Sequence, residues 1–269
     1  MKKLALIYDF DKTLSPKNMQ EFHYTESLGY KNPGEFWDKC SIETEKNKMD
    51  SVLSYMMLMQ KERDHLTRKD LLKEGKYITL FKGVDTWFKR INAIGKKHGI
   101  EVEHYIISSG IKEMIEGTSI AKEFKKIYAC SYAYDEKGEV VWPAMVVNYT
   151  TKTQYLFRIN KGVLDETNDF DLNRSTPEEE KYIPFSNMVY FGDGLTDVPS
   201  MKVVLSNGGY TIAIYDSPSE KQTLANELKH DKRANFALKA DYSKGSKVEE
   251  VITGIIESIE AKNRLEKLK

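Results

Sequence analysis

From Lys82 to the C-terminus, short apolar runs alternate with amphipathic stretches. Strands that alternate with helices are typical of an α/β fold with an open, mostly parallel sheet covered on both faces. At the N-terminus, Leu4–Tyr8 has the continuous apolar pattern of a strand buried on both faces. The other predicted strands lie at residues 102–109, 124–130, 186–194, 210–216 and 237–243, and the predicted helices at residues 83–99, 152–160 and 247–265.

Residues 15–80 show a different pattern, with helical spacing and no strand-like alternation. We therefore expect two domains: a core formed by residues 1–14 and 81–269, and an inserted all-helical module formed by residues 15–80. The module is rich in Met and aromatic residues. These side chains either pack the interior of the module, which we favour because Met fills irregular gaps, or hold an apolar substrate tail.

The composition excludes several classes of protein. The 269 residues carry 41 Lys and Arg and 41 Asp and Glu, so the net charge is zero, unlike that of a non-specific nucleic-acid binder. No stretch approaches the roughly 18 apolar residues that cross a bilayer, and the N-terminal apolar run is too short for a secretory signal. The two cysteines fit a reducing compartment. We expect a cytoplasmic protein that binds neither nucleic acid nor membrane; the sequence leaves its oligomeric state open.

Polar residues follow several predicted strands, at the edge where open α/β sheets bind ligands. Asp9 and Asp11 follow the first strand, and side chains two residues apart on an extended chain share a face. Either both carboxylates point into one pocket, or Asp11 opens a turn and Asp9 is there by chance. Ser108, Ser109 and Gly110 end the next predicted strand and can bind an anion or cap a helix.

Two further groups follow later in the chain. Lys152 begins a predicted helix, where a lysine is unfavourable unless an anion is near. Lys161 is the competing candidate, and we favour Lys152 because the start of this helix lies nearer the strand ends. The most specific pattern is Gly192-Asp193-Gly194, followed by Asp197. Its glycines allow a tight turn close to a ligand, and Asp197 is alternatively the cap of the next helix.

If these strand ends are neighbours, four carboxylates converge: those of Asp9, Asp11, Asp193 and Asp197. Such a group repels itself, and its burial without a partner is costly. A hard divalent cation removes the conflict, and a ligand set of oxygens without His or Cys favours Mg²⁺. Because Mg²⁺ is commonly bound together with substrate phosphates, the serine and lysine supply the rest of a phosphate site.

These motifs resemble those of the haloacid dehalogenase (HAD) superfamily, whose phosphatases use an aspartate nucleophile. The matching segments are DFDKT at residues 9–13, the Ser of YIISSG, the Lys of TTKTQ and GDGLTD at residues 192–197, in the order of the family. The helical insertion is similar to the cap of the phosphoserine-phosphatase-like branch. The resemblance implies a Rossmann-like core with a helical cap, and a Mg²⁺-dependent phosphatase that hydrolyses a phosphomonoester of a small metabolite.

The resemblance also implies a role for each matching residue. Asp9 is the nucleophile that becomes an aspartyl phosphate, and Asp11 is the general acid and then the general base. The phosphoryl oxygens are held by a group of small and basic residues, namely Ser108, Ser109, Gly110 and Lys152. The Mg²⁺ ion is held by a group of aspartates, namely Asp9, Asp11 through its backbone carbonyl, Asp193, and Asp197 directly or through water.

One position departs from the phosphoserine phosphatases. That branch has a glutamate that recognises the amino group of the substrate, and Asn18 stands in its place, with Gln20 and Glu21 out of register. This departure argues against phosphoserine as the substrate. If the helical module closes over the site and excludes water, its hinges are expected near Ser15-Pro16 and Lys82-Gly83.

Three other functions fit parts of the pattern. A phosphotransferase or mutase of the same fold passes the aspartyl phosphate to another alcohol, and the motifs barely separate it from a phosphatase. A phospho-accepting regulatory module also joins acids, a hydroxyl and a lysine around Mg²⁺, but its chain is about half as long. A glycosyltransferase with a metal-binding Asp-x-Asp motif needs a nucleotide-binding region before the motif, and residues 1–8 leave no room for it.

Overall fold

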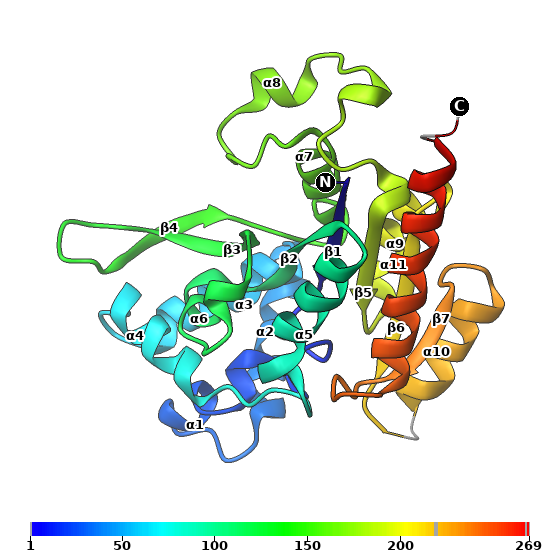
Figure 1. Ribbon diagram of the computed structural model, residues 1–269. Coiled ribbons are helices and arrows are strands. Elements are labelled where there is room, and N and C mark those ends of the chain that lie inside the picture. The colour runs from blue at the N-terminus through cyan, green and yellow to red at the C-terminus, as the bar shows by residue number, and fades with distance from the viewer. Residues whose placement is uncertain (1, 218–219, 267, 269) are drawn as a thin grey trace.

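The computed structural model describes residues 2–217, 220–266 and 268. In this part of the chain, the centre is a seven-stranded sheet with the order β4-β3-β2-β1-β5-β6-β7 (Figure 1). Its strands are β1 (Lys2–Tyr8), β2 (Ile100–Ile111), β3 (Lys126–Tyr134), β4 (Val140–Met145), β5 (Met188–Gly192), β6 (Tyr210–Tyr215) and β7 (Phe236–Lys239). Strand β4 pairs with β3 in antiparallel fashion, and the other neighbouring pairs are parallel. The predicted α/β fold with a mostly parallel sheet is therefore confirmed.

Helices lie on both faces of the sheet, as right-handed crossovers between parallel strands require. Helices α5 and α11 pack against each other, whereas α9 packs against α7, β5 and β6. The α-helices are α1 (Tyr24–Ser27), α2 (Pro33–Asn47), α3 (Ser51–Glu62), α4 (Arg68–Glu74), α5 (Val84–Lys97), α6 (Lys112–Glu116), α7 (Lys152–Lys161), α8 (Asp169–Asn173), α9 (Val198–Ser206), α10 (Glu220–His230) and α11 (Lys247–Glu266). Within the described residues, every helix is too short or too polar to span a lipid bilayer.

Strand β1 lies at the centre of the sheet because its apolar run needs burial on both faces. Every residue from Leu4 to Tyr8 is fully buried. Tyr8 is paired with Ile106 of β2 and with Phe191 of β5, so the carboxyl ends of these strands meet at one edge. The backbone N–H of Asp9 donates to the carbonyl of Phe191 at 2.9 Å and continues this contact past the end of β1. This edge therefore brings the first and last polar motifs together.

Three details differ from the sequence prediction. Strand β2 continues to Ile111, past its predicted end at residue 109, so Ser108–Gly110 lies inside the strand, and the pairing of β2 with β3 shifts register there. Helix α10 was not predicted. The polar segment before β5, for which the sequence predicts no helix, contains the short helix α8 and a 3₁₀ turn at Glu178–Glu180. Helix α8 has only five residues, which is too short for a periodicity of 3.6 residues to be detected in the sequence.

The described elements within residues 15–80 are helical, namely α1 to α4 and the 3₁₀ turns Met19–Glu21 and Gly75–Tyr77. They lie together beside the sheet, next to the β3–β4 hairpin (Figure 1). The two chain segments that join this module to the core run side by side, because the N–H of Phe81 donates to the carbonyl of Leu14 at 2.9 Å. The methionines Met56 and Met59 are fully buried. The boundaries of the two domains stay a prediction.

Helix α4 of the module contacts α6 of the core through glycines. A Cβ atom on Gly117 would lie 2.1 Å from the backbone oxygen of Leu72, and one on Gly75 would lie 2.0 Å from that of Met114. Both distances are shorter than any real contact of a Cβ atom, and backbone atoms cannot move aside cheaply. The module therefore contacts the core backbone to backbone at this point.

A buried hydrogen-bonded chain lies below the carboxyl end of β1. The indole N–H of Trp87 donates to the Tyr8 hydroxyl at 2.8 Å, and this hydroxyl lies 3.1 Å from Nδ1 of His104. Nε2 of His104 lies 2.9 Å from Oδ1 of Asn92. An amide oxygen only accepts, so His104 carries its proton on Nε2 and accepts from Tyr8 on Nδ1. Burial lowers the pKa of His104 to about 3, and the ring is neutral near pH 7.

The contact between α4 and α6 predicts that replacing glycine by alanine has opposite effects on the free energy of unfolding at Gly117 and at Gly254. Gly117→Ala should lower the free energy of unfolding by about 1–3 kcal/mol, because the added methyl group overlaps the backbone of α4. Gly254→Ala, the matched control, has open space around its Cβ position inside α11 and should raise the free energy of unfolding by about 0.5–1 kcal/mol. Urea denaturation measures both. Equal effects of the two substitutions would contradict the close packing of α4 on α6.

His104 predicts a dependence of stability on pH. Its pKa is about 3 in the folded protein and about 6.5 in the unfolded chain, so unfolding takes up a proton at every pH between these values. The contribution of His104 is complete above about pH 6.5 and falls by about 1.4 kcal/mol per pH unit as the pH drops towards 3. The difference in unfolding free energy between the wild type and His104→Gln should therefore shrink between pH 7 and pH 5. A difference that is constant over this range would show that His104 does not resist protonation.

Candidate active site

The loop after β1 places two carboxylates on one side. Phe10 is fully buried in the core, so Asp9 and Asp11, on either side of it, both face the cavity at the edge of the sheet. The N–H of Phe10 donates to Oδ1 of Asp9 at 2.8 Å, and the N–H of Met19 donates to Oδ1 of Asp11 at 3.0 Å. Lys12 turns the chain away with a positive φ of 58°. The carboxylates of Asp9 and Asp11 thus share one pocket, and the chain also turns directly after Asp11.

Strand β2 supplies the next wall of the site. Ser108 is buried, and its Oγ accepts from the N–H of Gly110 at 3.1 Å, so the hydroxyl hydrogen can be donated to a ligand. A Cβ atom on Gly110 would lie 2.1 Å from Cε of Met19, so the end of this flexible side chain would have to shift to admit it. Ser108, Ser109 and Gly110 all line the cavity. The three residues therefore lie where the sequence predicts, although they belong to the strand itself.

Lys152 is fully buried at the start of α7 and lies directly behind Asp9. Its Nζ lies 3.1 Å from Oδ2 of Asp9 and 2.7 Å from Oδ1 of Asp197. Lys161, the competing candidate, instead donates from Nζ to the backbone carbonyls of Leu172 and Arg174, at 2.6 Å each. The geometry therefore selects Lys152 as the lysine of the site.

The loop after β5 is folded around the carboxylate of Asp197. Its Oδ2 accepts from the N–H groups of Asp193 and Gly194 at 3.2 and 3.3 Å, and its Oδ1 accepts from the hydroxyl of Tyr190 at 2.8 Å. Gly192 is required here, because a Cβ atom would lie 2.4–2.6 Å from the carboxylate group of Asp197. Both oxygens of Asp197 are thus engaged in holding the loop and Lys152.

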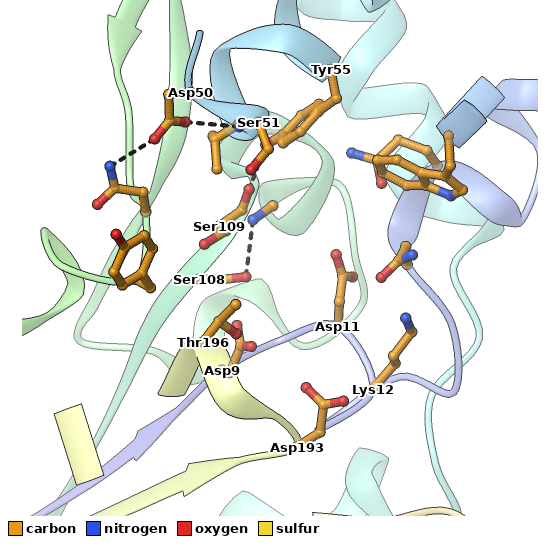
Figure 2. Close-up of a pocket in the computed structure, with 17 residues that line it drawn as sticks. Asp9, Asp11, Lys12, Asp50, Ser51, Tyr55, Ser108, Ser109, Asp193 and Thr196 are labelled. Atoms are coloured by element: carbon orange, nitrogen blue, oxygen red, sulfur yellow. Dashed lines mark hydrogen bonds between the residues drawn. The ribbon is translucent and has the colours of Figure 1, made fainter. Parts of the chain in front are cut away.

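The cavity at this edge has a volume of about 360 Å³. Figure 2 shows Asp9, Asp11, Asp193 and Ser108 around one end, and Asp50, Ser51 and Tyr55 of the helical module at the opposite end. Its remaining lining residues are Lys12, Asn18, Gln20, Trp37, Val52, Ser109, Gly110, Asn148, Tyr149 and Thr196. The core and the helical module therefore both contribute to one cavity.

The ionisation of the site reflects its burial and its mutual charges. Burial raises the pKa of Asp9, Lys152 opposes the change, and Asp197 and Asp193 add to it, so that the pKa is about 6. Burial and the Asp9 charge raise the pKa of Asp11 well above its usual value, although the Met19 N–H opposes this. Burial lowers the pKa of Lys152, but the charges of Asp197 and Asp9 outweigh it and hold the pKa well above its usual value.

Three of the four predicted aspartates form a group that fits a metal ion. Carboxylate oxygens of Asp9, Asp193 and Asp197 lie within 4.8 Å of one another, and all three residues are buried. Lys152 offsets one of their charges, so a divalent cation complements the excess negative charge. Oxygen donors suit Mg²⁺. The side chain of Asp11 is outside this group, and the predicted role of its backbone carbonyl stays a prediction.

The sequence reasoning missed the wall of the cavity that the module supplies. Trp37 and Tyr55 lie on α2 and α3, and Asp50 caps α3 by accepting from the N–H groups of Val52 and Leu53 at 2.8 and 3.3 Å. The pattern Asp50-Ser51 before an apolar run is a signal for a helix N-terminus that could have located this end of α3. Met56 and Met59 pack inside the module, as favoured above, whereas the aromatic residues Trp37 and Tyr55 line the cavity.

Comparison with known sequences gives a relative but no family model. No model of a protein family matches the chain. A protein of Borreliella burgdorferi that is itself described as uncharacterised is 28% identical over 282 residues, which are 91% of this chain and 93% of the relative.

Solved structures give the class of fold. A HAD family hydrolase from Salmonella enterica serovar Typhi is similar with a TM-score of 0.57 and 14% identity, over 87% of this chain and 66% of that one. A substrate-bound phosphoserine phosphatase is similar with a TM-score of 0.56 and 18% identity, over 88% of this chain and 93% of that one. The chain therefore has the fold of the HAD hydrolases and, within them, one like that of the phosphoserine phosphatases.

The aspartate group predicts that Mg²⁺ stabilises the protein. At about 100 times its Kd, Mg²⁺ should raise the free energy of unfolding by about 2.7 kcal/mol, which thermal denaturation detects as a higher Tm. Asp193→Asn should abolish the response to Mg²⁺, because it removes one of the three grouped carboxylates. The matched control, Asp38→Asn, changes an exposed aspartate on α2 and should respond like the wild type. An undiminished Mg²⁺ response of Asp193→Asn would contradict the site.

Proposed function

We propose that this protein is a Mg²⁺-dependent phosphatase that hydrolyses a phosphomonoester of a small metabolite through an aspartyl phosphate on Asp9. The observation that carries the proposal is the position of Asp9. Its carboxylate lies between the buried ammonium group of Lys152, at 3.1 Å, and the cavity that also contains Asp11 and Ser108. The likeness in fold to HAD hydrolases and phosphoserine phosphatases supports the proposal.

In the first step, a carboxylate oxygen of Asp9 attacks phosphorus and the bond from phosphorus to the ester oxygen breaks. The leaving alkoxide takes a proton from Asp11 and departs as an alcohol. Asp11 must be protonated for this step, and its raised pKa, caused by burial and by the charge of Asp9, favours the protonated form. A covalent intermediate divides one difficult displacement into two easier steps.

In the second step, Asp11, now a carboxylate, removes a proton from a water molecule, and the oxygen of this water attacks phosphorus. The bond between phosphorus and the Asp9 oxygen breaks, which releases inorganic phosphate and restores both aspartates. Ser108 donates its hydroxyl hydrogen to a phosphoryl oxygen, and Lys152 donates the Nζ hydrogen that remains beyond those directed at Asp9 and Asp197. These donors are fixed before the reaction, so they stabilise the charge without reorganisation.

Mg²⁺ supplies charge neutralisation for the phosphoryl oxygens. We assign its binding to the carboxylates of Asp9 and Asp193 and to the backbone carbonyl of Asp11. Asp197 contributes through water, because its two oxygens already accept from Lys152, Tyr190 and two backbone N–H groups. A cation beside Asp9 would lower its pKa from about 6 and favour the ionised nucleophile.

The helical module of residues 15–80 is proposed to act as a cap that excludes water during phosphoryl transfer. Its contribution to the cavity through Asp50 and Tyr55 supports this role. Location in the cytoplasm and the expected lack of nucleic-acid and membrane partners stay predictions from the sequence.

The proposal is tested by phosphate release from a panel of phosphorylated metabolites, measured with and without Mg²⁺. Asp9→Asn keeps the shape of the side chain and removes the nucleophile, so release should fall by at least about a thousandfold. Asp38→Asn is the matched control on the surface of α2 and should keep full activity. Undiminished release by Asp9→Asn would contradict the covalent role.

A competing alcohol in the same assay separates hydrolysis from transfer. For a phosphatase, the phosphate should appear as free inorganic phosphate when the alcohol is present in excess. A phosphorylated alcohol as the main product would instead identify the phosphotransferase alternative, in which the same aspartyl phosphate has a different acceptor.

A further inference from the structure

The two ends of the cavity are lined by different groups. Asp9 and Asp193 lie around the end that is proposed to hold the phosphate, and Asp50 lies at the opposite end, where Figure 2 shows it near Ser51 and Tyr55. A phosphomonoester bound at Asp9 therefore directs its alcohol towards Asp50. Among the described residues that line the cavity, Lys12 is the one cation, and it lies on the same loop as Asp9.

The end near Asp50 offers little to a second anion. The N-terminus of α3 points here, but the Asp50 carboxylate already caps it through the N–H groups of Val52 and Leu53. The side-chain N–H of Asn148 donates to the other oxygen of Asp50 at 3.0 Å. The positive end of the helix dipole is thus offset by a carboxylate of this chain. An additional carboxylate or phosphate on the substrate would face Asp50 without a partner.

Gln20 also offers an unpaired hydrogen-bond acceptor to the cavity. The residue is 1% exposed, and its Oε1 has no hydrogen-bond partner among the described residues. Because a buried acceptor without a partner is unfavourable, a hydrogen-bond donor on the ligand would be favourable here. Together with the Asp50 carboxylate, the Oε1 atom of Gln20 favours a ligand that donates hydrogen bonds.

Aromatic rings complete the wall. The indole N–H of Trp37 donates to Glu21 at 2.8 Å, and the hydroxyl of Tyr55 donates to the carbonyl of Ser109. Because their polar atoms are engaged by the protein, Trp37 and Tyr55 offer their ring surfaces to the cavity, which Tyr149 also lines. A carboxylate beside aromatic faces is the environment that binds ammonium groups through charge and cation–π attraction.

We propose that the substrate is the phosphate ester of an alcohol that carries a positively charged amino or quaternary ammonium group and no second anionic group. This inference rests on the proposed function, since it assigns the alcohol end of the same cavity. Asp50 of α3 provides the counter-charge. Glu21 does not, because it is not among the residues that line the cavity.

Three esters of matched length test the charge preference: O-phosphoethanolamine, 2-hydroxyethyl phosphate and phosphoglycolate, whose alcohols carry a positive, a neutral and a negative group. We expect kcat/KM to be about tenfold higher for the first than for the second, and lowest for the third. Equal values, or a preference for phosphoglycolate, would overturn the inference.

Asp50→Asn removes the charge and keeps a residue that caps helices well, so α3 should stay folded. The variant should reduce the ratio of kcat/KM for O-phosphoethanolamine to that for 2-hydroxyethyl phosphate to about one. Asp38→Asn, on the exposed face of α2, is the matched control and should keep the ratio of the wild type. An unchanged ratio in Asp50→Asn would show that Asp50 does not determine the preference for a positively charged substrate.

Two further measurements separate this inference from the proposed function. Hydrolysis of para-nitrophenyl phosphate that depends on Asp9 supports the phosphatase whatever the order of the three esters. Calorimetric titration of the three esters into the Asp9→Asn protein measures the binding order without turnover. Tightest binding of O-phosphoethanolamine supports the inference even if no ester is hydrolysed, and equal or reversed binding contradicts it while leaving the phosphatase in place.

Discussion

The site depends on one buried cation, the ammonium group of Lys152, which is shared by Asp9 and Asp197. Three buried carboxylates could not lie within 4.8 Å of one another in an apolar interior without positive charge. Lys152 supplies one such charge from the start of α7. The remaining negative charge is what makes the opposite side of Asp9 suitable for a divalent cation and for a phosphate ester bound with it.

The fold brings these groups together by topology. Strand β1 lies between β2 and β5, so three segments far apart in the sequence end at one edge of the sheet. Below this edge, Tyr8 is held by Trp87 and His104, and Tyr190 holds Asp197 from the neighbouring strand. The reactive carboxylates are therefore fixed by residues that lie one layer deeper, on strands that cannot shift without breaking the core.

The sequence predicted this part of the molecule well because its signals are local. An apolar strand followed by Asp9 and Asp11, and a glycine-flanked Asp193, each identify a strand end from a few neighbouring residues. The far wall of the cavity could not be predicted in this way. Asp50 reaches it only because α3 packs against the sheet, through contacts between distant segments such as Tyr55 with Ser109 and Tyr132 with Met56. The continuation of β2 through Gly110 was missed because glycine and serine are typical of turns.

The central claim is that the Asp9 carboxylate becomes covalently phosphorylated. Borohydride reduces an acyl phosphate, so treatment of the protein during turnover should convert the phosphorylated aspartate to homoserine. Mass analysis of the peptide that contains residues 9–11 tests this directly. The account predicts homoserine at position 9, formed only when a phosphate ester and Mg²⁺ are present. An unmodified Asp9 in a protein that is turning over substrate, or homoserine at another aspartate, would contradict it.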